Sequence, residues 1–282
     1  MPKLNRFKKY ATTENMIFKN LLNRPHCIIL FLALFSIMTK TQAESINIAV
    51  ASNFITTAKQ LAQLFEQQTK HKINISGGSS GKLFVQIKNA APYDLFLSAD
   101  IQKPKELVRL GLAVESSRQT YALGQLSLWL KKGCHKKSPL HSLISNHINR
   151  IAIANPNIAP YGASTKSWLI KKALWLPIQA KLVFTENISQ TAQLAKLAVV
   201  DAAFIAHSQN SKLLSTGCII KLSHYPLIKQ QLVLIKTSNQ QALAKQFIQF
   251  LYNKPAQNLI KNMGYILPTS AKITLLLNRS SK

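Results

Sequence analysis

Short apolar runs alternate along this chain with longer segments in which apolar residues recur every three to four positions. Runs such as 46–50 and 202–206 have the length and composition of buried strands. The segment 56–68 instead places its apolar residues on one face of a helix. This repeated alternation of strand and helix predicts an α/β fold whose sheets are mainly parallel and carry helices on both faces.

The same pattern assigns strands and helices to most of the chain between residues 46 and 262. We expect strands at 46–50, 72–75, 93–100, 120–130, 150–154, 181–184, 202–206 and 232–235, and helices at 56–68, 82–90, 103–110, 163–174, 186–197, 241–251 and 255–262. The long run 120–130 is expected to pass from a first domain to a second, and 232–235 to return. Two similar halves joined by two crossings indicate a two-lobed protein with a cleft between the lobes.

The predicted domain boundaries follow these crossings. Residues 44–125 form the first part of lobe 1, 126–230 form lobe 2, and 231–270 return to lobe 1. Residues 1–43 and 271–282 are expected to lie outside both lobes, the latter as a tail rich in Ser and Lys.

The first 43 residues have the three parts of an export signal. A basic stretch is followed by an apolar segment, 27–38, and then by small residues at Thr41 and Ala43, where a signal peptidase would cut. The apolar segment is shorter than the ~20 residues that span a bilayer. We therefore expect a cleaved signal peptide and an exported protein, with an uncleaved membrane anchor as the alternative.

The chain is strongly basic, with 36 Lys and Arg residues against 9 Asp and Glu and a net charge of +27. Such a charge raises the question of nucleic-acid binding. The basic residues are nevertheless spread along the chain, lysine far outnumbers arginine, and no zinc-ligand spacing or RNA-binding motif is present. We expect no nucleic-acid partner, and a positive field that attracts anions.

Two strand-to-helix turns carry groups suited to binding an anion. The run 76–83, Ser-Gly-Gly-Ser-Ser-Gly-Lys-Leu, follows one predicted strand, and Ser52-Asn53 follows another. Hydroxyl groups and the unpaired N–H groups of a first helical turn together favour a negative ligand. Such serines can also serve only as helix caps, so the capping interpretation stays open. Turns that follow adjacent parallel strands would meet in one crevice.

Several further segments match a known family in order and spacing. They are Ala-Val-Ala-Ser-Asn-Phe at 49–54, Ser79-Ser80, Pro-Tyr-Asp-Leu-Phe-Leu-Ser-Ala-Asp at 92–100, Asn155-Pro156, Pro-Tyr-Gly at 160–162, Glu-Asn-Ile at 186–188 and Gly-Tyr-Ile-Leu-Pro at 264–268. With these residues the chain resembles the periplasmic molybdate-binding proteins of ABC transporters, in the type II branch of periplasmic binding proteins, from about residue 46 to 268. The resemblance implies two lobes, each a mainly parallel sheet flanked by helices, with the ligand cleft between them.

In that family, hydroxyl and backbone N–H groups from both lobes hold the four oxygens of a tetrahedral dianion. The matched positions assign the first serine to Ser52, with Asn53 contributing its backbone N–H. The second serine corresponds to Ser80, with Ser79 as the competing assignment. Tyr161 and Ile188 match the positions that each supply a backbone N–H from the other lobe.

Tyr161 departs from the arrangement of some members, which have alanine there and a ligand-binding tyrosine at the position of Ala206. The two residue types are exchanged in this chain. We therefore expect the Tyr161 hydroxyl to supply a hydrogen bond from the opposite wall of the site. A half-buried surface aromatic is the alternative interpretation.

Several other polar residues invite functional interpretations. Asp94 and Asp100 could be metal ligands or acid–base groups, but a lone carboxylate would repel an anion, so we expect a structural role at the strand end. His207 is expected to be a hydrogen-bonded loop residue. Cys134 and Cys218 could form a disulfide or remain two separate thiols. The two interpretations stay equally open, because the sequence does not show the distance between the residues.

A site made only of hydrogen-bond donors suits molybdate, which is fully deprotonated at neutral pH and offers acceptors alone. Hydrogen phosphate carries a proton, and its hydroxyl would stay unsatisfied in a site without a carboxylate. Tungstate is nearly the same size as molybdate, whereas sulfate has shorter bonds. We therefore expect molybdate and tungstate as ligands, with a receptor of the same fold for another ligand, such as sulfate or ferric ion, as the alternative.

The resemblance also implies the partners of this protein. The membrane permease of an ABC importer would recognise the closed form of a periplasmic, monomeric protein. No cofactor is expected, and molybdenum would be bound only as the oxyanion. We expect no catalytic residue, although Ser79 or Ser80 with His207 is a conceivable nucleophile and base.

Overall fold

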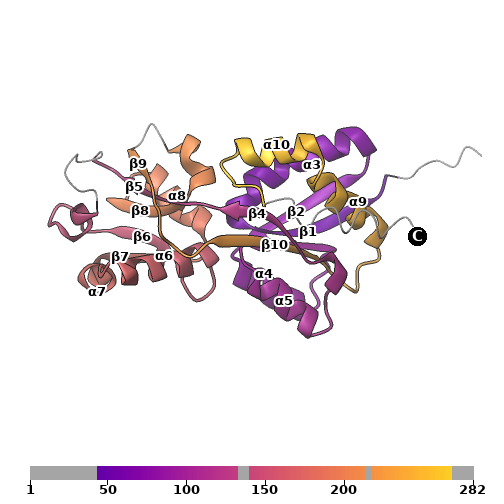
Figure 1. Ribbon diagram of the computed structural model, residues 1–282, viewed down its shortest axis with the longest axis horizontal. Helices are drawn as coiled ribbons and strands as arrows, with labels where there is room; N and C mark the ends of the chain where they lie inside the picture. Colours follow the sequence, from indigo (N-terminus) through magenta and orange to yellow (C-terminus); the bar gives the residue numbers. More distant parts are fainter. Residues whose placement is uncertain (1–42, 133–139, 214–216, 269–282) are drawn as a thin grey trace, which may run out of the picture. The chain divides into compact units, whose positions relative to one another are not determined.

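The computed structural model describes residues 43–132, 140–213 and 217–268. Their strands and helices belong to one compact unit that contains two five-stranded sheets (Figure 1). Residues 1–42, which hold nearly all of the expected signal peptide, lie outside the described residues, as do Cys134 and the expected tail. Among the described residues, no helix is long and apolar enough to cross a bilayer.

The first sheet has the strand order β2-β1-β3-β10-β4, and we refer to it with its helices as lobe 1. Its strands are β1 Ser45–Ala51, β2 Lys72–Gly78, β3 Leu95–Leu97, β4 Gln119–Gly124 and β10 Ile228–Leu234. Its helices are α3 Ile55–Thr69, α4 Ser80–Lys88, α5 Gln102–Arg109, α9 Gln241–Leu251 and α10 Lys254–Asn262, with 3-10 turns at η1 Ser52–Phe54 and η2 Glu115–Ser117.

Alternate residues of the central strands pack on opposite faces of this sheet. Ile48 and Val50 of β1 join residues of α3, α9 and α10 in one apolar cluster, whereas Ala49 between them joins residues of α4 and α5 in another. Phe96 of β3 lies in the second cluster, while its two neighbours lie in the first. Side chains alternate along a strand, so a sheet covered on both faces needs strands that are apolar throughout.

The second sheet has the strand order β7-β6-β8-β5-β9, and we refer to it with its helices as lobe 2. Its strands are β5 Leu126–Leu130, β6 Ile151–Ala154, β7 Leu182–Thr185, β8 Ala202–Ala206 and β9 Cys218–Lys221. Its helices are α6 Pro160–Lys171, α7 Trp175–Ile178 and α8 Ile188–Lys196, with 3-10 turns at η3 His141–Ile144, η4 Gln179–Lys181 and η5 His207–Lys212. Trp168 of α6 packs in the cluster on one face and Ala195 of α8 in the cluster on the other.

In each lobe, one strand runs against the other four. This strand is β10 in lobe 1 and β5 in lobe 2, and each is antiparallel to both of its neighbours. They are the strands by which the chain enters each lobe from the other (Figure 1). The predicted α/β fold with two mainly parallel, helix-flanked sheets is therefore confirmed.

The long run predicted at 120–130 forms two strands, not one. β4 and β5 lie in different sheets and are separated by Gln125. The backbone carbonyl of Gln125 accepts a 2.8 Å hydrogen bond from His207 N–H, and its side-chain Nε2 donates to Gly264 O at 2.8 Å. Leu123 and Ile266 also form an isolated antiparallel bridge. The segment after α10 is thus attached at the first crossing between the lobes.

Several local features differ from the sequence expectation. β10 begins at Ile228 and not at 232, and β3 covers only Leu95–Leu97 of the expected 93–100. The strand β9 was not predicted, and its first residue, Cys218, is disulfide-bonded. Helix α6 begins at Pro160, three residues earlier than expected. Proline suits the first helical position because its missing N–H would have no partner there in any case.

Candidate functional site

A small cavity lies where the two predicted strand-to-helix turns of lobe 1 meet the first turns of α6 and α8 from lobe 2. Its volume is about 10 Å³. All six residues predicted for the site line it, and none of the described residues around it is acidic or basic. The lining residues are Ala51, Ser52, Asn53, Gly78, Ser79, Ser80, Ala99, Ala159, Pro160, Tyr161 and Ile188. The wall therefore offers hydroxyl and backbone N–H groups without a charged side chain.

Ser52 and Asn53 lie in η1, directly after β1, and both are buried. Both hydrogens of the Asn53 side-chain amide have acceptors, because its Nδ2 donates to Gln230 Oε1 at 2.9 Å and to Tyr265 Oη at 3.2 Å. Tyr265 in turn donates from its hydroxyl to Asn53 O at 2.8 Å. These bonds fix the backbone of η1, whose first N–H groups have no partner within the turn. The expectation that Asn53 acts through its backbone N–H is compatible with this geometry.

Ser79 and Ser80 have different local roles at the start of α4. Ser79 is the N-cap residue, and its Oγ accepts from Lys82 N–H at 3.3 Å. The Oγ of Ser80 instead accepts from Ala99 N–H at 3.0 Å. A hydroxyl whose oxygen already accepts a hydrogen bond keeps its hydrogen for donation. Ser79 therefore caps α4, and the hydroxyl hydrogens of both Ser79 and Ser80 remain available to the cavity that both residues line.

Helix α8 presents Ile188 as its first residue on the other wall. Its N-cap residue Asn187 accepts through Oδ1 from the N–H groups of Ser189 and Gln190. The cap therefore uses the second and third N–H groups of the helix and not that of Ile188. A helix N-terminus also carries partial positive charge, which favours an anion at this position.

Tyr161, in the first turn of α6, is buried rather than half-exposed. Its hydroxyl oxygen has no partner at hydrogen-bond distance and angle among the described residues, although the Asn53 side chain lies near it, and a Cβ at Gly124 would overlap that oxygen. Burial raises the pKa of Tyr161 well above the usual value, so the group is a neutral hydroxyl and a donor. The surface-aromatic alternative is therefore wrong, while the contact between this hydroxyl and a ligand stays a prediction.

Contacts between the lobes surround the cavity. Gly81 N–H donates to Ile158 O at 2.9 Å, and Ser189 Oγ donates to Ser52 O at 2.8 Å. Lys82 Nζ also lies 3.2 Å from the Glu186 carboxylate of the facing lobe. Because each of these pairs joins one lobe to the other, the structure shows the two lobes closed over the cavity.

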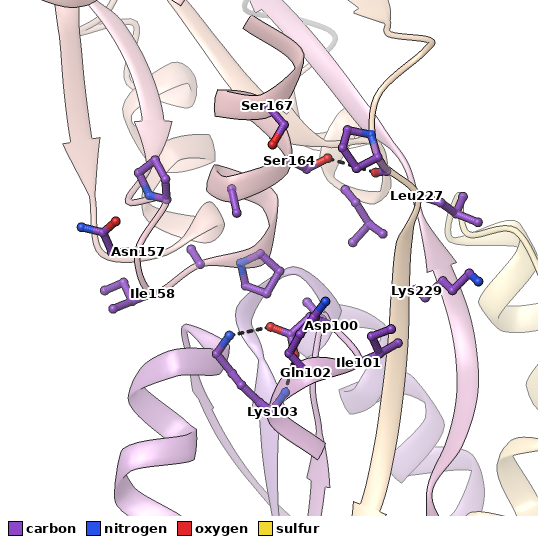
Figure 2. A pocket seen from close by; sticks show the side chains of 17 residues that line it. Asp100, Ile101, Gln102, Lys103, Asn157, Ile158, Ser164, Ser167, Leu227 and Lys229 are labelled. Carbon is purple, nitrogen blue, oxygen red and sulfur yellow. Dashed lines mark hydrogen bonds and ion pairs between the residues drawn. The ribbon is translucent and has the colours of Figure 1, made fainter. Parts of the chain in front are cut away.

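A larger cavity of about 340 Å³ adjoins the small one and shares Ala99, Ala159 and Pro160 with it (Figure 2). Figure 2 shows Asp100 in this larger cavity, where its carboxylate pairs with Lys103. The Asp100 carboxylate therefore lies in the larger cavity, beside the small cavity and not within it.

The structural role expected for Asp94 is confirmed by its partners. Its carboxylate accepts from Asn47 N–H at 2.7 Å and from the Ser238 hydroxyl at 2.6 Å, so it ties β1 to the segment after β10. Among the described residues, no group of three His, Cys, Asp or Glu side chains could hold a metal ion.

His207 is a hydrogen-bonded residue after β8, as predicted. Its Nδ1 lies 3.0 Å from Ser127 Oγ and 2.6 Å from Asn210 Nδ2. Burial lowers the pKa of His207, which favours the neutral ring. Residues 77–81 read Gly-Gly-Ser-Ser-Gly, the spacing of a hydrolase nucleophile elbow around Ser79, but the partners of His207 are Ser127 and Asn210.

Three residues next to the site were missed by the sequence analysis. They are Tyr121 of β4, Gln230 of β10 and Tyr265 after α10, all buried and all bonded to Asn53 or to one another. Gln230 stands between Lys229 and Gln231 in the polar half of β10, so the local pattern did not mark it as buried. The predicted strand accordingly began at residue 232.

The family model for bacterial extracellular solute-binding proteins matches residues 46–266. The molybdate-binding protein ModA of Rhodobacter capsulatus is 35% identical over 77% of this chain and 86% of the relative. ModA of Azotobacter vinelandii is 34% identical over 79% of this chain and 90% of the relative.

Solved structures agree with these relationships. The periplasmic molybdate-binding protein of Azotobacter vinelandii matches with a TM-score of 0.75 and 35% identity, covering 79% of this chain and 100% of that chain. The sulfate-binding protein SubI of Mycobacterium tuberculosis matches with a TM-score of 0.67 at 13% identity, over 84% of this chain and 90% of that chain, which supports the fold alone. On the extent of the family match and the identity to these relatives, the chain belongs to the bacterial extracellular solute-binding proteins.

Proposed function

We propose that this protein captures molybdate, and tungstate with it, outside the cytoplasmic membrane and delivers it to the permease of an ABC importer. The observation that carries the proposal is the closed cavity between the lobes, which is lined by serine hydroxyls and first-turn N–H groups and by no carboxylate. The relatives named as molybdate-binding proteins support the choice of ligand.

The chemistry of the donors favours a fully deprotonated oxyanion. The hydroxyls of Ser52 and Ser80, which line the cavity, carry polar hydrogens that can point at an acceptor. Molybdate accepts at all four oxygens, whereas hydrogen phosphate would leave its own hydroxyl without an acceptor, at a cost of about 1–3 kcal/mol. Oriented neutral dipoles act strongly on an anion in a site that excludes water.

Transport follows from lobe closure rather than from chemistry. A dianion bonded to both walls would stabilise the closed state, since it contacts both lobes only there. The permease would recognise that closed form of a periplasmic monomer. No covalent step and no cofactor enter this function, and molybdenum is carried only as the oxyanion.

Thermal unfolding of the mature chain tests the proposal. At a ligand concentration of 100 times the dissociation constant, binding stabilises the folded state by about 2.7 kcal/mol, which raises the melting temperature by several degrees. We expect such a rise with sodium molybdate and sodium tungstate and none with phosphate. Ser52→Ala should reduce the rise, whereas Ser76→Ala, an exposed serine of β2, should not. No rise with either molybdate or tungstate would overturn the proposal.

A further inference from the structure

Gln230 is a fully buried polar residue in β10, one of the strands that cross between the lobes. Its Oε1 accepts from Asn53 Nδ2 at 2.9 Å and from Tyr121 Oη at 3.2 Å. Tyr265 donates its one hydroxyl hydrogen to Asn53 O, so the Asn53 atom that faces its oxygen is the donor Nδ2. The Gln230 atom that Asn53 Nδ2 contacts is therefore the amide oxygen, and the other end of the Gln230 side chain is the NH₂ group. That group, Nε2, has no hydrogen-bond partner among the described residues.

A second buried group without a partner lies close to Gln230 Nε2. A Cβ at Gly124 would overlap the Tyr161 hydroxyl oxygen and would lie 3.1 Å from Gln230 Nε2. The two polar groups therefore converge on the same glycine, one from lobe 2 and one from the crossing strand. Buried polar groups are seldom left unsatisfied, because each one costs free energy, so two that face one point indicate a shared role.

A β-bulge in lobe 1 positions the Gln230 side chain. Gln230 pairs with Ala122 and Gln231 pairs with Thr120, so Tyr121 is the extra residue of a β-bulge in β4. Bulges often occur beside functional sites, where they redirect a side chain. Here the Tyr121 hydroxyl lies 3.2 Å from both Gln230 Oε1 and Ser98 O. The bulge thus holds the amide oxygen of Gln230 in place.

We propose that Gln230 is a positioning residue of the oxyanion site that connects its two walls. Its Oε1 holds Asn53 of lobe 1, and its Nε2 donates to the hydroxyl oxygen of Tyr161 from lobe 2 when the oxyanion is bound. A tyrosine whose oxygen accepts from Gln230 has its own hydrogen free to donate to the ligand. Gln230 itself does not line the cavity and acts through these two neighbours. This inference rests on the proposed function.

Gln230→Glu tests the donor directly. Glutamic acid keeps the acceptor for Asn53 and Tyr121, and burial raises the pKa of a carboxyl in this position. The protonated acid can donate as Nε2 does, but the carboxylate has no donor and repels a dianion. We expect titration calorimetry to give molybdate affinity within a few-fold of wild type at pH 6 and at least about 30-fold weaker at pH 8.5. Wild-type affinity should be the same at both values.

The neighbouring glutamine supplies the matched control. Gln231 is half-buried, accepts from Arg118 through Oε1 at 3.0 Å, and donates to Thr120 Oγ1 at 3.2 Å. Gln231→Glu makes the same amide-to-carboxyl replacement in the same strand, at a side chain that does not line the cavity. It should leave molybdate affinity unchanged at both pH values. An equal pH-dependent loss in both variants would overturn the inference.

Gln230→Met keeps the test decisive if the buried acid prevents folding. Methionine keeps the length of the side chain without a donor or an acceptor, and we expect about 10-fold weaker binding. In a Tyr161→Phe background, Gln230→Met should reduce molybdate affinity by a clearly smaller factor, because the hydroxyl to which Nε2 donates is absent. Wild-type binding together with unaltered affinity in the Gln230 variants overturns this inference alone. A wild-type protein that binds neither molybdate nor tungstate overturns the proposed function and this inference with it.

Discussion

The backbone N–H of Gly81, in the first turn of α4, donates a 2.9 Å hydrogen bond to the carbonyl oxygen of Ile158 on the facing lobe. A Cβ at position 81 would lie 2.8 Å from that oxygen and 3.0 Å from the Ile158 Cα. The absence of a side chain therefore allows the two backbones to touch. Since Ser80 precedes Gly81, this contact closes the lobes directly beside the proposed oxyanion site.

Gly81→Ala is expected to weaken molybdate binding by about 10-fold or more, because a methyl group at this contact opposes the closed state by roughly 1–3 kcal/mol. The stability of the free protein should change little. Titration calorimetry measures the affinity, and small-angle scattering with saturating ligand measures closure. Gly77→Ala is the control, because its Cβ would meet the Ile55 side chain within lobe 1. Unchanged affinity in Gly81→Ala would show that closure does not depend on this contact.

Ser80→Ala and Ser79→Ala should separate ligand binding from helix capping. Ser80→Ala removes a hydroxyl that lines the cavity, and we expect a loss of about 1–3 kcal/mol in molybdate binding. Ser79→Ala removes the N-cap of α4 and should lower the free energy of unfolding by about 1 kcal/mol. Calorimetric titration and urea unfolding of both variants check this. A larger binding loss in Ser79→Ala would reverse the assignment of the second serine.

The ion pair between Lys82 and Glu186 is expected to contribute little to molybdate affinity. Both side chains are substantially exposed, and exposed pairs contribute at most about 1 kcal/mol. Lys82→Ala should therefore change molybdate affinity less than about 5-fold, and 0.5 M NaCl should remove most of that difference. Titrations at low and high salt test this. A large loss that persists in high salt would give Lys82 a direct part in holding the ligand.

Alkaline pH should destabilise the protein through its buried tyrosines. Burial raises the pKa of Tyr265 to about 12, against a usual value of 10.0, and raises the pKa values of Tyr121 and Tyr161 well above that value. An unfolded chain loses these protons at lower pH than the folded chain. The stabilisation is thus complete below pH 10 and is lost as the pH rises toward 12.

Urea midpoints at pH 8 and pH 11 measure this loss of stability. Lysines also titrate in this range, so Tyr265→Phe is used to separate the contribution of Tyr265 from theirs. The difference between the two midpoints should be smaller in Tyr265→Phe than in wild type. Equal differences in the two proteins would show that Tyr265 ionises alike in the folded and unfolded chains.

The order of strands and helices was predictable because both sheets are buried on both faces. Strand β8 is apolar throughout, β1 is apolar and buried from Ile48 to Ala51, and a helix such as α3 shows its apolar face in the sequence. The split of the run 120–130 was not visible, because both strands are mostly apolar and the single residue between them, Gln125, does not resemble a turn. A pattern of burial alone does not show that successive residues enter different sheets.

The candidate site was predictable where motif and local structure coincide. Ser52, Ser80 and Ile188 each lie at or next to the start of a helix or 3-10 turn, and the family motif marks all three. Gln230 depends instead on contacts with Asn53, 177 positions away along the chain, and with Tyr121 on another strand. Contacts of this range are set by the fold and leave no local pattern in the sequence.

A pocket with donors from both lobes and no carboxylate should select a bare dianion over a protonated one. Isothermal titration of the mature wild-type chain with molybdate and with phosphate, in the same buffer at pH 7.5, tests it most directly. We predict saturable one-to-one binding of molybdate and no measurable heat of binding with phosphate. Phosphate binding of comparable strength, or no binding of molybdate, would contradict this account.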